Sequence, residues 1–221
     1  MEDIMNTKLT REDIRHMDTW LKNKGLKYMD IRYELIDHLV EEYQQLKYAP
    51  DLESFLLKRL MWCKKVDKQK QKAVNLGMTK ELFNRFFRVM THPLWLCLLL
   101  FVVLGLFWLS TIIPIKFFRK AYFGLYLLPI AYQIYLMFFS GLGSKIKKQA
   151  ISAVYLVNIF TIPQLPLYFI GLIPDGLAHN PNFYIPVFSV GIVLNIVAIL
   201  FFYEKRSALR VEFELLNSQF S

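Results

Sequence analysis

Four carboxylates and one histidine recur at helical spacing in a single stretch of the chain. They are Asp30, Glu34, Asp37, His38 and Glu41. At about 100° per residue these positions share one narrow face of a helix, which we call the acidic stripe. Such a stripe can dock a basic partner, bind a metal ion weakly, or simply face solvent. Because a metal ion needs ligands that converge from several directions, and one helix with a single histidine does not supply them, we expect no metal here. Docking and a solvated helix face both stay open.

The stretch from Lys58 to Lys72 carries the opposite charge. Its seven cations are accompanied by one anion, Asp67. These cations can neutralise the acidic stripe, or lie near anionic lipid headgroups at about 1 kcal/mol per cation. Nucleic acid is not expected as a partner, because no helix-turn-helix spacing or aromatic-glycine motif accompanies the charge.

The sequence lacks the residue patterns of common catalytic sites. Its four histidines are scattered and include no HExxH pair. Residues 140–144 combine serine with glycine without forming a nucleophile elbow. Since no nucleophile is placed beside a base, we expect a non-enzymatic protein without a cofactor.

The carboxyl-terminal part of the chain is apolar and contains a few amide side chains. They are Gln133, Asn158, Gln164 and Asn195. Amides in a membrane prefer to face other helices, so we expect these four to point inward and to hydrogen-bond across the bundle. Pro163 and Pro166 bracket Gln164 and each removes a helical hydrogen bond, which predicts a helix break. Backbone carbonyls freed by such a break can bind a ligand or line a cavity.

Charge density divides the chain into two parts. Residues 1–88 hold 32 of the 45 charged residues, and residues 89–203 hold 7. The apolar part contains four charge-free runs of 24 to 28 residues, and each is long enough for one helix to cross about 30 Å of hydrocarbon. We therefore predict an all-α protein in which a cytoplasmic helical domain precedes a four-helix transmembrane bundle. The expected membrane domain is 92–203, with spans at about 93–115, 121–142, 151–173 and 183–203, followed by a cytoplasmic tail at 204–221.

The distribution of cations predicts an orientation with both termini in the cytoplasm. Nine Lys and Arg residues flank the inner ends of the spans, against Lys116, Arg119 and Lys120 outside. The first 25 residues are charged and contain no apolar segment typical of a signal peptide. The loop that holds Lys116–Lys120 is the exception, because its cations disfavour translocation. A hairpin of the first two runs that does not fully cross would keep them inside.

The first 90 residues are predicted to be helical. Thr10 caps a first helix that Gly25 ends, and a second helix follows from about Lys27 to Lys47. Residues 1–77 form the predicted cytoplasmic domain. Gly77 is expected to break the chain, so that residues 78–91 form a short amphipathic elbow helix in the inner membrane interface. The alternative is that this segment is a plain continuation of the first membrane helix.

The pair Trp20-Leu21 and the stretch from Ile31 to Glu42 resemble the HAAS family, small bacterial helical domains that precede several membrane helices. The stretch is similar to an E-L-x-D-H-L-x-E signature, whose polar positions are matched by Glu34, Asp37, His38 and Glu41. The resemblance implies a cytoplasmic signalling or interaction domain, often encoded beside PadR-like transcriptional regulators.

Together these features predict a non-enzymatic, multi-pass protein of the bacterial inner membrane that signals or docks a partner through its cytoplasmic domain. Its expected partners are the lipid bilayer, a cytoplasmic protein such as a PadR-like regulator, and a second copy of the chain in a homo-oligomer. The alternative is a small passive permease or ligand-binding membrane protein with its site at Pro163 and Pro166.

Overall fold

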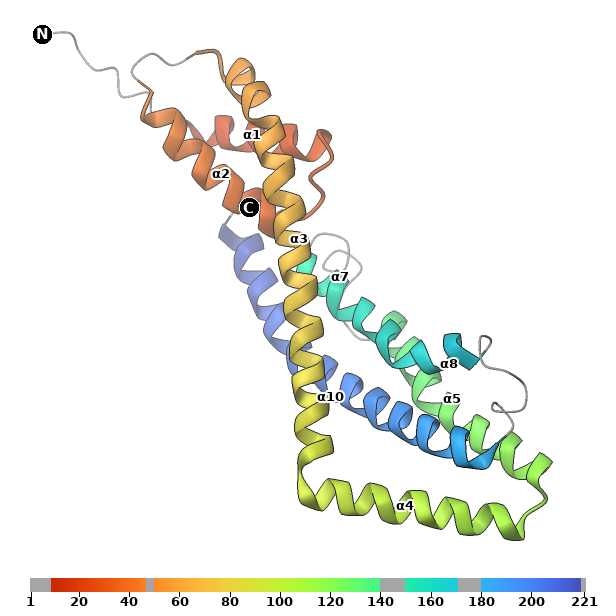
Figure 1. Cartoon of the computed structure of the whole chain (residues 1–221). Coiled ribbons are helices and arrows are strands. Elements are labelled where there is room, and N and C mark those ends of the chain that lie inside the picture. The colour runs from red at the N-terminus through yellow and green to blue at the C-terminus, as the bar shows by residue number, and fades with distance from the viewer. Residues whose placement is uncertain (1–8, 47–49, 140–149, 171–179, 220–221) are drawn as a thin grey trace, which may run out of the picture. The chain divides into compact units, whose positions relative to one another are not determined.

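The structure is a computed structural model that describes residues 9–46, 50–139, 150–170 and 180–219. Every secondary-structure element in these ranges is a helix, which confirms the predicted all-α class (Figure 1). Contacts divide the chain into two units. The helical unit comprises Met1–Leu76, Ser144–Val154 and Glu212–Ser221, and the apolar unit comprises Gly77–Gly143 and Tyr155–Val211.

The helical unit begins with a capped helix, α1 (Arg11–Asn23). The Asp13 N–H donates to Thr10 Oγ1 at 3.2 Å, and the Thr10 N–H donates to the Asp13 carboxylate at 2.8 Å. This reciprocal capping box confirms the predicted start of the helix. The hydrogen bond from the Thr10 N–H is also the largest cause that lowers the pKa of the Asp13 carboxyl group. Gly25 ends α1 with a φ of 96°, a conformation that favours glycine.

A buried arginine holds α2 (Met29–Gln44) against the end of α1. Arg32 is 4% exposed, and its Nε lies 2.6 Å from the Asp18 carboxylate. Its guanidinium also donates to the carbonyls of Leu26 and Lys27 at 3.2 and 2.9 Å. Because a buried charge without partners would be costly, these three acceptors fix the turn between the two helices.

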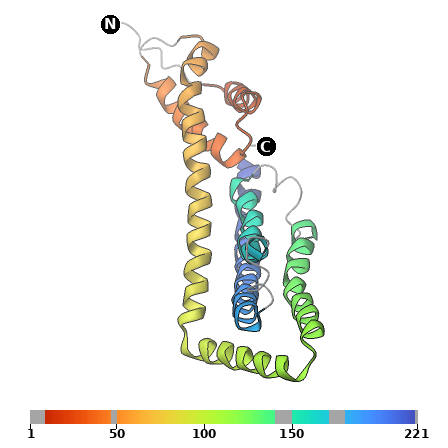
Figure 2. The same ribbon diagram turned by 45° about the vertical axis from the view of Figure 1, so that its right-hand side comes forward.

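The third helix, α3 (Leu52–Thr91), is one uninterrupted element of 40 residues (Figure 2). The prediction that Gly77 ends a helix and that residues 78–91 form a separate one is therefore wrong. An interior glycine costs a helix about 1 kcal/mol relative to alanine, which weakens it without breaking it. Residues on the carboxyl-terminal side of Gly77, including the buried Leu82 and Phe86, pack within the apolar unit and offset that cost.

Four helical segments are long and apolar enough to cross a membrane, as expected for a multi-pass membrane protein. They are α4 (Pro93–Ile112), α5 (Ile115–Phe139), the segment Ile151–Tyr168, and Pro181–Val211 within α10 (Pro181–Gln219). The third of these is composite. It consists of α7 (Ile151–Asn158), a 3-10 helix, η1 (Ile159–Gln164), and the start of α8 (Leu165–Ile170).

Two helix boundaries differ from the sequence prediction. Helix α5 starts at Ile115, directly after Pro114, so Lys116, Arg119 and Lys120 belong to its first turns and not to a loop. Helix α10 continues beyond Tyr203 through the charged residues to Gln219. Charge alone does not end a helix, because Lys, Arg and Glu are good helix formers.

One hydrophobic cluster of the apolar unit is mostly aromatic and lies between α5 and α10. Its buried members are Phe118, Tyr122, Tyr126, Ile130, Tyr184, Ile185 and Phe188. Tyr126 and Phe188 are in direct ring contact, with centroids 4.8 Å apart. In contrast, α4 has no buried residue within the described part of the chain, and Phe101 and Trp108 are largely exposed. Such an apolar exterior is consistent with contact to lipid.

Candidate functional site

The acidic stripe of α2 is partly covered by the basic helix α3. Glu34 pairs with Lys70 at 2.7 Å, and Glu42, one residue beyond the stripe, pairs with Arg59. His38 lies edge-on to Trp62, with ring centroids 6.4 Å apart. The basic stretch was predicted either to neutralise the acidic stripe or to lie near lipid headgroups. Arg59 and Lys70 of α3 pair with glutamates of α2, which corresponds to the first of these uses. Like-charge repulsion along the stripe is thereby relieved at one edge.

Asp30 has a structural contact of its own. One carboxylate oxygen accepts the Ile151 N–H at 3.1 Å, at the first residue of α7, and the other accepts the Ile31 N–H at 3.0 Å. A carboxylate at a helix amino terminus satisfies a backbone donor and favours the helix dipole. Asp30 is therefore engaged at the start of the third candidate span.

Asp37 and Glu41 are the two carboxylates of the acidic stripe that stay exposed. No ion pair to either side chain occurs within the described ranges. In the same residues, no group of three His, Cys, Asp or Glu side chains lies close enough to hold a metal ion. The part of the stripe open to a partner is thus reduced to Asp37, Glu41 and the exposed His38.

The third candidate span is a 3-10 helix around Pro163, between the α-helices α7 and α8. Helix η1 contains this residue, and Pro166 stands in the first turn of α8. Pro166 has no N–H with which to continue the 3-10 pattern to the Pro163 carbonyl. That carbonyl instead accepts the Tyr126 hydroxyl at 3.0 Å and the Asn195 amide at 3.4 Å. The predicted break is thus a change of helix type, and α5 and α10 each donate a hydrogen bond to the Pro163 carbonyl.

The amides Gln133 and Asn195 complete this arrangement, and we call Tyr126, Gln133, Pro163 and Asn195 the buried polar cluster. Gln133 Nε2 donates to Asn195 Oδ1 at 2.8 Å, and both side chains are 0% exposed. Asn195 also donates to the Gly191 carbonyl at 2.7 Å. The inward orientation predicted for these two amides is present.

The same prediction is wrong for Asn158, which is exposed, whereas Gln164 is half-buried. The inward face of this segment is formed instead by neighbouring apolar residues, among them Leu156, Ile159 and Phe160. The prediction used side-chain polarity alone, and Asn158, at the end of α7, lies outside the face that these apolar residues bury.

Tyrosines in α5 supply polar contacts that sequence reasoning missed. Tyr122 donates to the Ile185 carbonyl at 3.0 Å, and its hydroxyl lies 2.7 Å from Ser189 Oγ. The available signal was spacing, because Tyr122, Tyr126 and Gln133 lie at i, i+4 and i+11 and therefore share a helix face. These residues form one polar face of α5, from which Tyr122 and Gln133 contact α10.

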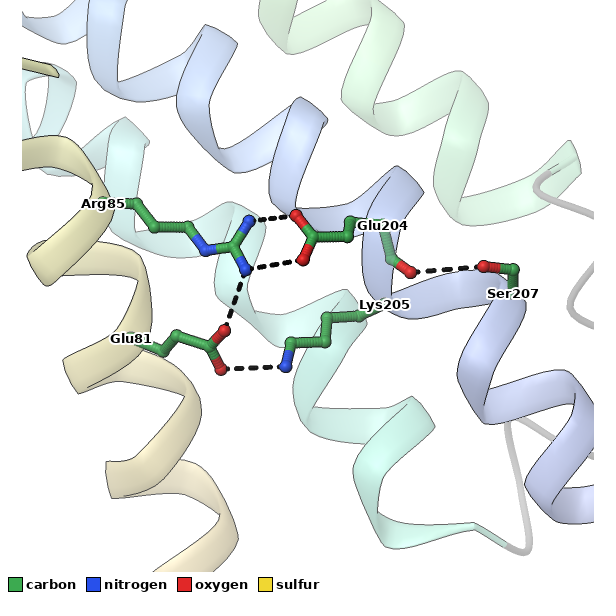
Figure 3. A network of polar contacts seen from close by, with 5 residues as sticks. All are labelled: Glu81, Arg85, Glu204, Lys205 and Ser207. Atoms are coloured by element: carbon green, nitrogen blue, oxygen red, sulfur yellow. Dashed lines mark hydrogen bonds and ion pairs between the residues drawn. The ribbon is translucent and has the colours of Figure 1, made fainter.

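A second missed feature is an ion network between α3 and α10 (Figure 3). Arg85 makes a two-pronged contact with the Glu204 carboxylate, and its Nη2 lies 2.9 Å from Glu81. Glu81 also lies 3.1 Å from Lys205 Nζ. The Arg85 guanidinium lies 4.9 Å from the centroid of the Phe201 ring, where cation–π attraction adds to the contact. We call Glu81, Arg85, Glu204 and Lys205 the ion network.

The ion network shifts the pKa of its α3 members in opposite directions. Hydrogen bonding to Glu204, and then to Glu81, raises the pKa of Arg85 against the effect of partial burial. Partial burial would raise the pKa of Glu81, but hydrogen bonds from Lys205 and Arg85 lower it below its ordinary value. Both residues are thus held in their charged forms. The only sequence signal was the i, i+4 pair Glu81 and Arg85, since Glu204 is 119 residues away.

The fold and these sites define an all-α chain with four candidate membrane spans and no recognisable catalytic constellation among the described residues. Comparison with protein-family models, curated proteins and solved structures finds no match to this chain.

Proposed function

We propose that this protein is a non-enzymatic signalling or partner-docking protein of the bacterial cytoplasmic membrane, with both termini in the cytoplasm. The observation that carries the proposal is the continuity of α3. In its first half this helix contacts α2 through Arg59 and Lys70, and in its second half it contacts α10 through Glu81 and Arg85. A partner that displaces α2 would therefore act on a helix that is also bound to a candidate span.

The docking surface in this proposal is the exposed remainder of the acidic stripe, namely Asp37, His38 and Glu41. Its complement is a cytoplasmic protein with a cationic surface, because two neighbouring carboxylates favour positive charge. The resemblance of α2 to the HAAS signature supports a PadR-like regulator as this partner. Glu34 belongs to the intramolecular contact with Lys70, so the surface does not depend on it.

The test is binding of a purified PadR-like regulator from the same organism to the detergent-solubilised full chain. Asp37→Lys combined with Glu41→Lys reverses the charge of the docking surface and is expected to weaken binding at least tenfold. Glu12→Lys combined with Glu214→Lys makes the same charge change at exposed positions outside the stripe and should leave binding within about twofold. Equal affinity for both double variants would contradict the docking role.

The alternative of a permease or ligand site at Pro163 and Pro166 has less support. The Pro163 carbonyl is the acceptor that a polar ligand would use, and Tyr126 and Asn195 already donate to it. A hollow of about 290 Å³ lies beside Pro166, and its lining, which includes Phe83, Leu165 and Phe183, is apolar. We therefore place the function in the helical unit.

A further inference from the structure

A basic hollow lies in the helical unit between the end of α1 and the middle of α3. Its volume is about 550 Å³. Four lysines contribute to its lining, Lys24 from the end of α1 and Lys64, Lys65 and Lys68 from α3. Asp67 is the one acidic residue in the lining. Four positive charges and one negative charge leave a net charge of +3 around the hollow.

These lysines differ from the cations of α3 that contact α2. Arg59 and Lys70 are each paired with a glutamate of α2, whereas none of the four lining lysines forms an ion pair within the described residues. Lys64 and Lys68 also stand at i and i+4, where like charges repel one another. A bound anion would relieve this repulsion, because Asp67 is the single carboxylate among the four lysines of this lining.

The remaining walls define what kind of anion fits. Leu26 is buried, and Met61, at 78% exposure, adds an apolar surface beside the lysines. Gly25, with its φ of 96°, lines the hollow without a side chain. A ligand that combines a multiply charged head with an organic body matches such a lining, since each ammonium can donate a charge-assisted hydrogen bond to a phosphate oxygen.

We propose that this hollow binds a phosphate-bearing anion. Two sources carry that chemistry, an anionic lipid headgroup and a soluble phosphate compound. The site is formed by other residues than the acidic stripe, so it goes beyond the proposed docking function and can be tested separately. A ligand here would contact α1 and α3 together and stabilise their packing.

The test uses the full chain in phosphatidylcholine nanodiscs, with acetylation of individual lysines measured by mass spectrometry. One arm adds inorganic pyrophosphate, and the other replaces part of the phosphatidylcholine with phosphatidylglycerol. In at least one arm we expect acetylation of Lys64 and Lys68 to slow at least threefold, with Lys58 and Lys72 nearly unchanged. Protection by pyrophosphate identifies a soluble phosphate compound, and protection by phosphatidylglycerol alone identifies a lipid headgroup.

Variants of the lining test the same site, because removal of positive charge should weaken binding and removal of negative charge should strengthen it. Lys64→Gln with Lys68→Gln should weaken binding of the effective probe about tenfold or more, because two charge-assisted contacts are lost. Lys58→Gln with Lys72→Gln removes equal charge from the same helix outside the hollow and should have less than about a twofold effect. Asp67→Asn should strengthen binding. Protection in neither arm, or equal protection of Lys58 and Lys72, would overturn the proposal. So would equal effects of the two lysine pairs.

Discussion

At the scale of single residues, Gly191 is the position where close packing against a tyrosine requires a glycine. A Cβ atom at this position would lie 2.7 Å from Tyr126 Cε2, closer than carbon atoms approach in proteins. Tyr126 is 0% exposed and bonded to the Pro163 carbonyl, so its ring cannot move without loss of that contact. The absence of a side chain at Gly191 in α10 thus leaves room for Tyr126 of α5 to donate to the Pro163 carbonyl in η1.

Gly191→Ala is therefore expected to destabilise the full chain by about 1–3 kcal/mol, the usual cost of overpacking. Gly124→Ala in α5 is the matched control, because no other side chain or distant backbone lies within 4 Å of its added Cβ. The control should be neutral or gain up to about 1 kcal/mol from helix propensity. Thermal unfolding in detergent micelles measures both, and a Gly191→Ala protein as stable as the control would refute the packing argument.

Cys63 offers a second prediction at this scale. Its side chain is 0% exposed, and burial raises the pKa of its thiol to about 11. At pH 8 only about one molecule in a thousand would carry the reactive thiolate. In a Cys97→Ser background, iodoacetamide should label folded Cys63 at least a hundredfold more slowly than the urea-unfolded chain. Lys58→Cys, exposed on the same helix, should react rapidly in the folded protein. Rapid labelling of Cys63 in the folded state would disprove its burial.

At the scale of elements, the ion network connects α3 and α10. Arg85→Glu places like charges beside Glu204 and should lower the Tm, and Glu204→Arg alone should lower it too. The double variant restores opposite charges and is expected to recover more than half of the loss, as a double-mutant cycle requires for a direct contact. Arg88→Glu, an exposed change one turn further along α3, serves as control. Additive losses in the double variant would exclude direct pairing.

The ion network also predicts a pH dependence. Because the folded pKa of Glu81 is lowered from its ordinary 4.5, its stabilising contribution is complete above pH 4.5 and lost as the pH falls through the folded value. The Tm of the wild-type protein should therefore exceed that of Glu81→Gln at pH 7, and the difference should disappear as the pH falls well below 4.5. A difference that persists at pH 2.5 would mean that charge is not its cause.

The helices differ in how far the sequence alone could predict them. Local signals sufficed for α1, where the cap at Thr10 and the stop at Gly25 act within a few residues. The local signal was misleading at Gly77. Glycine has a low helix propensity, but contacts of the residues before and after it keep α3 continuous. The hydropathy pattern identified Gln133 and Asn195 as polar residues of the spans, but not Tyr122 and Tyr126. Their hydroxyls reach acceptors only when α5 packs against α10 and η1. The ion network could not be predicted from the sequence for the same reason, because Arg85 and Glu204 come into contact only in the folded chain.

At the scale of the whole molecule, the structure changes how the membrane topology must be tested. The three cations that weaken the predicted N-in orientation lie in the first turns of α5. A probe at Phe118 would disturb the core, because this residue is 3% exposed and belongs to the aromatic cluster. Lys116 is exposed and two residues away, so a cysteine there reports on the same junction without a packing cost.

In a chain without Cys63 and Cys97, Lys116→Cys should react with a membrane-impermeant maleimide added outside intact cells if α4 crosses the bilayer. Lys72→Cys, exposed on α3, should react only after permeabilisation if α3 lies in the cytoplasm as proposed. A full crossing requires Lys116, Arg119 and Lys120 to pass the membrane, against the usual retention of cations inside. Labelling of Lys116→Cys only after permeabilisation would therefore identify α4 and α5 as a hairpin that enters and leaves on the cytoplasmic side. The exposed apolar surface of α4 would then lie in the inner leaflet, and two of the four candidate spans would no longer cross the membrane.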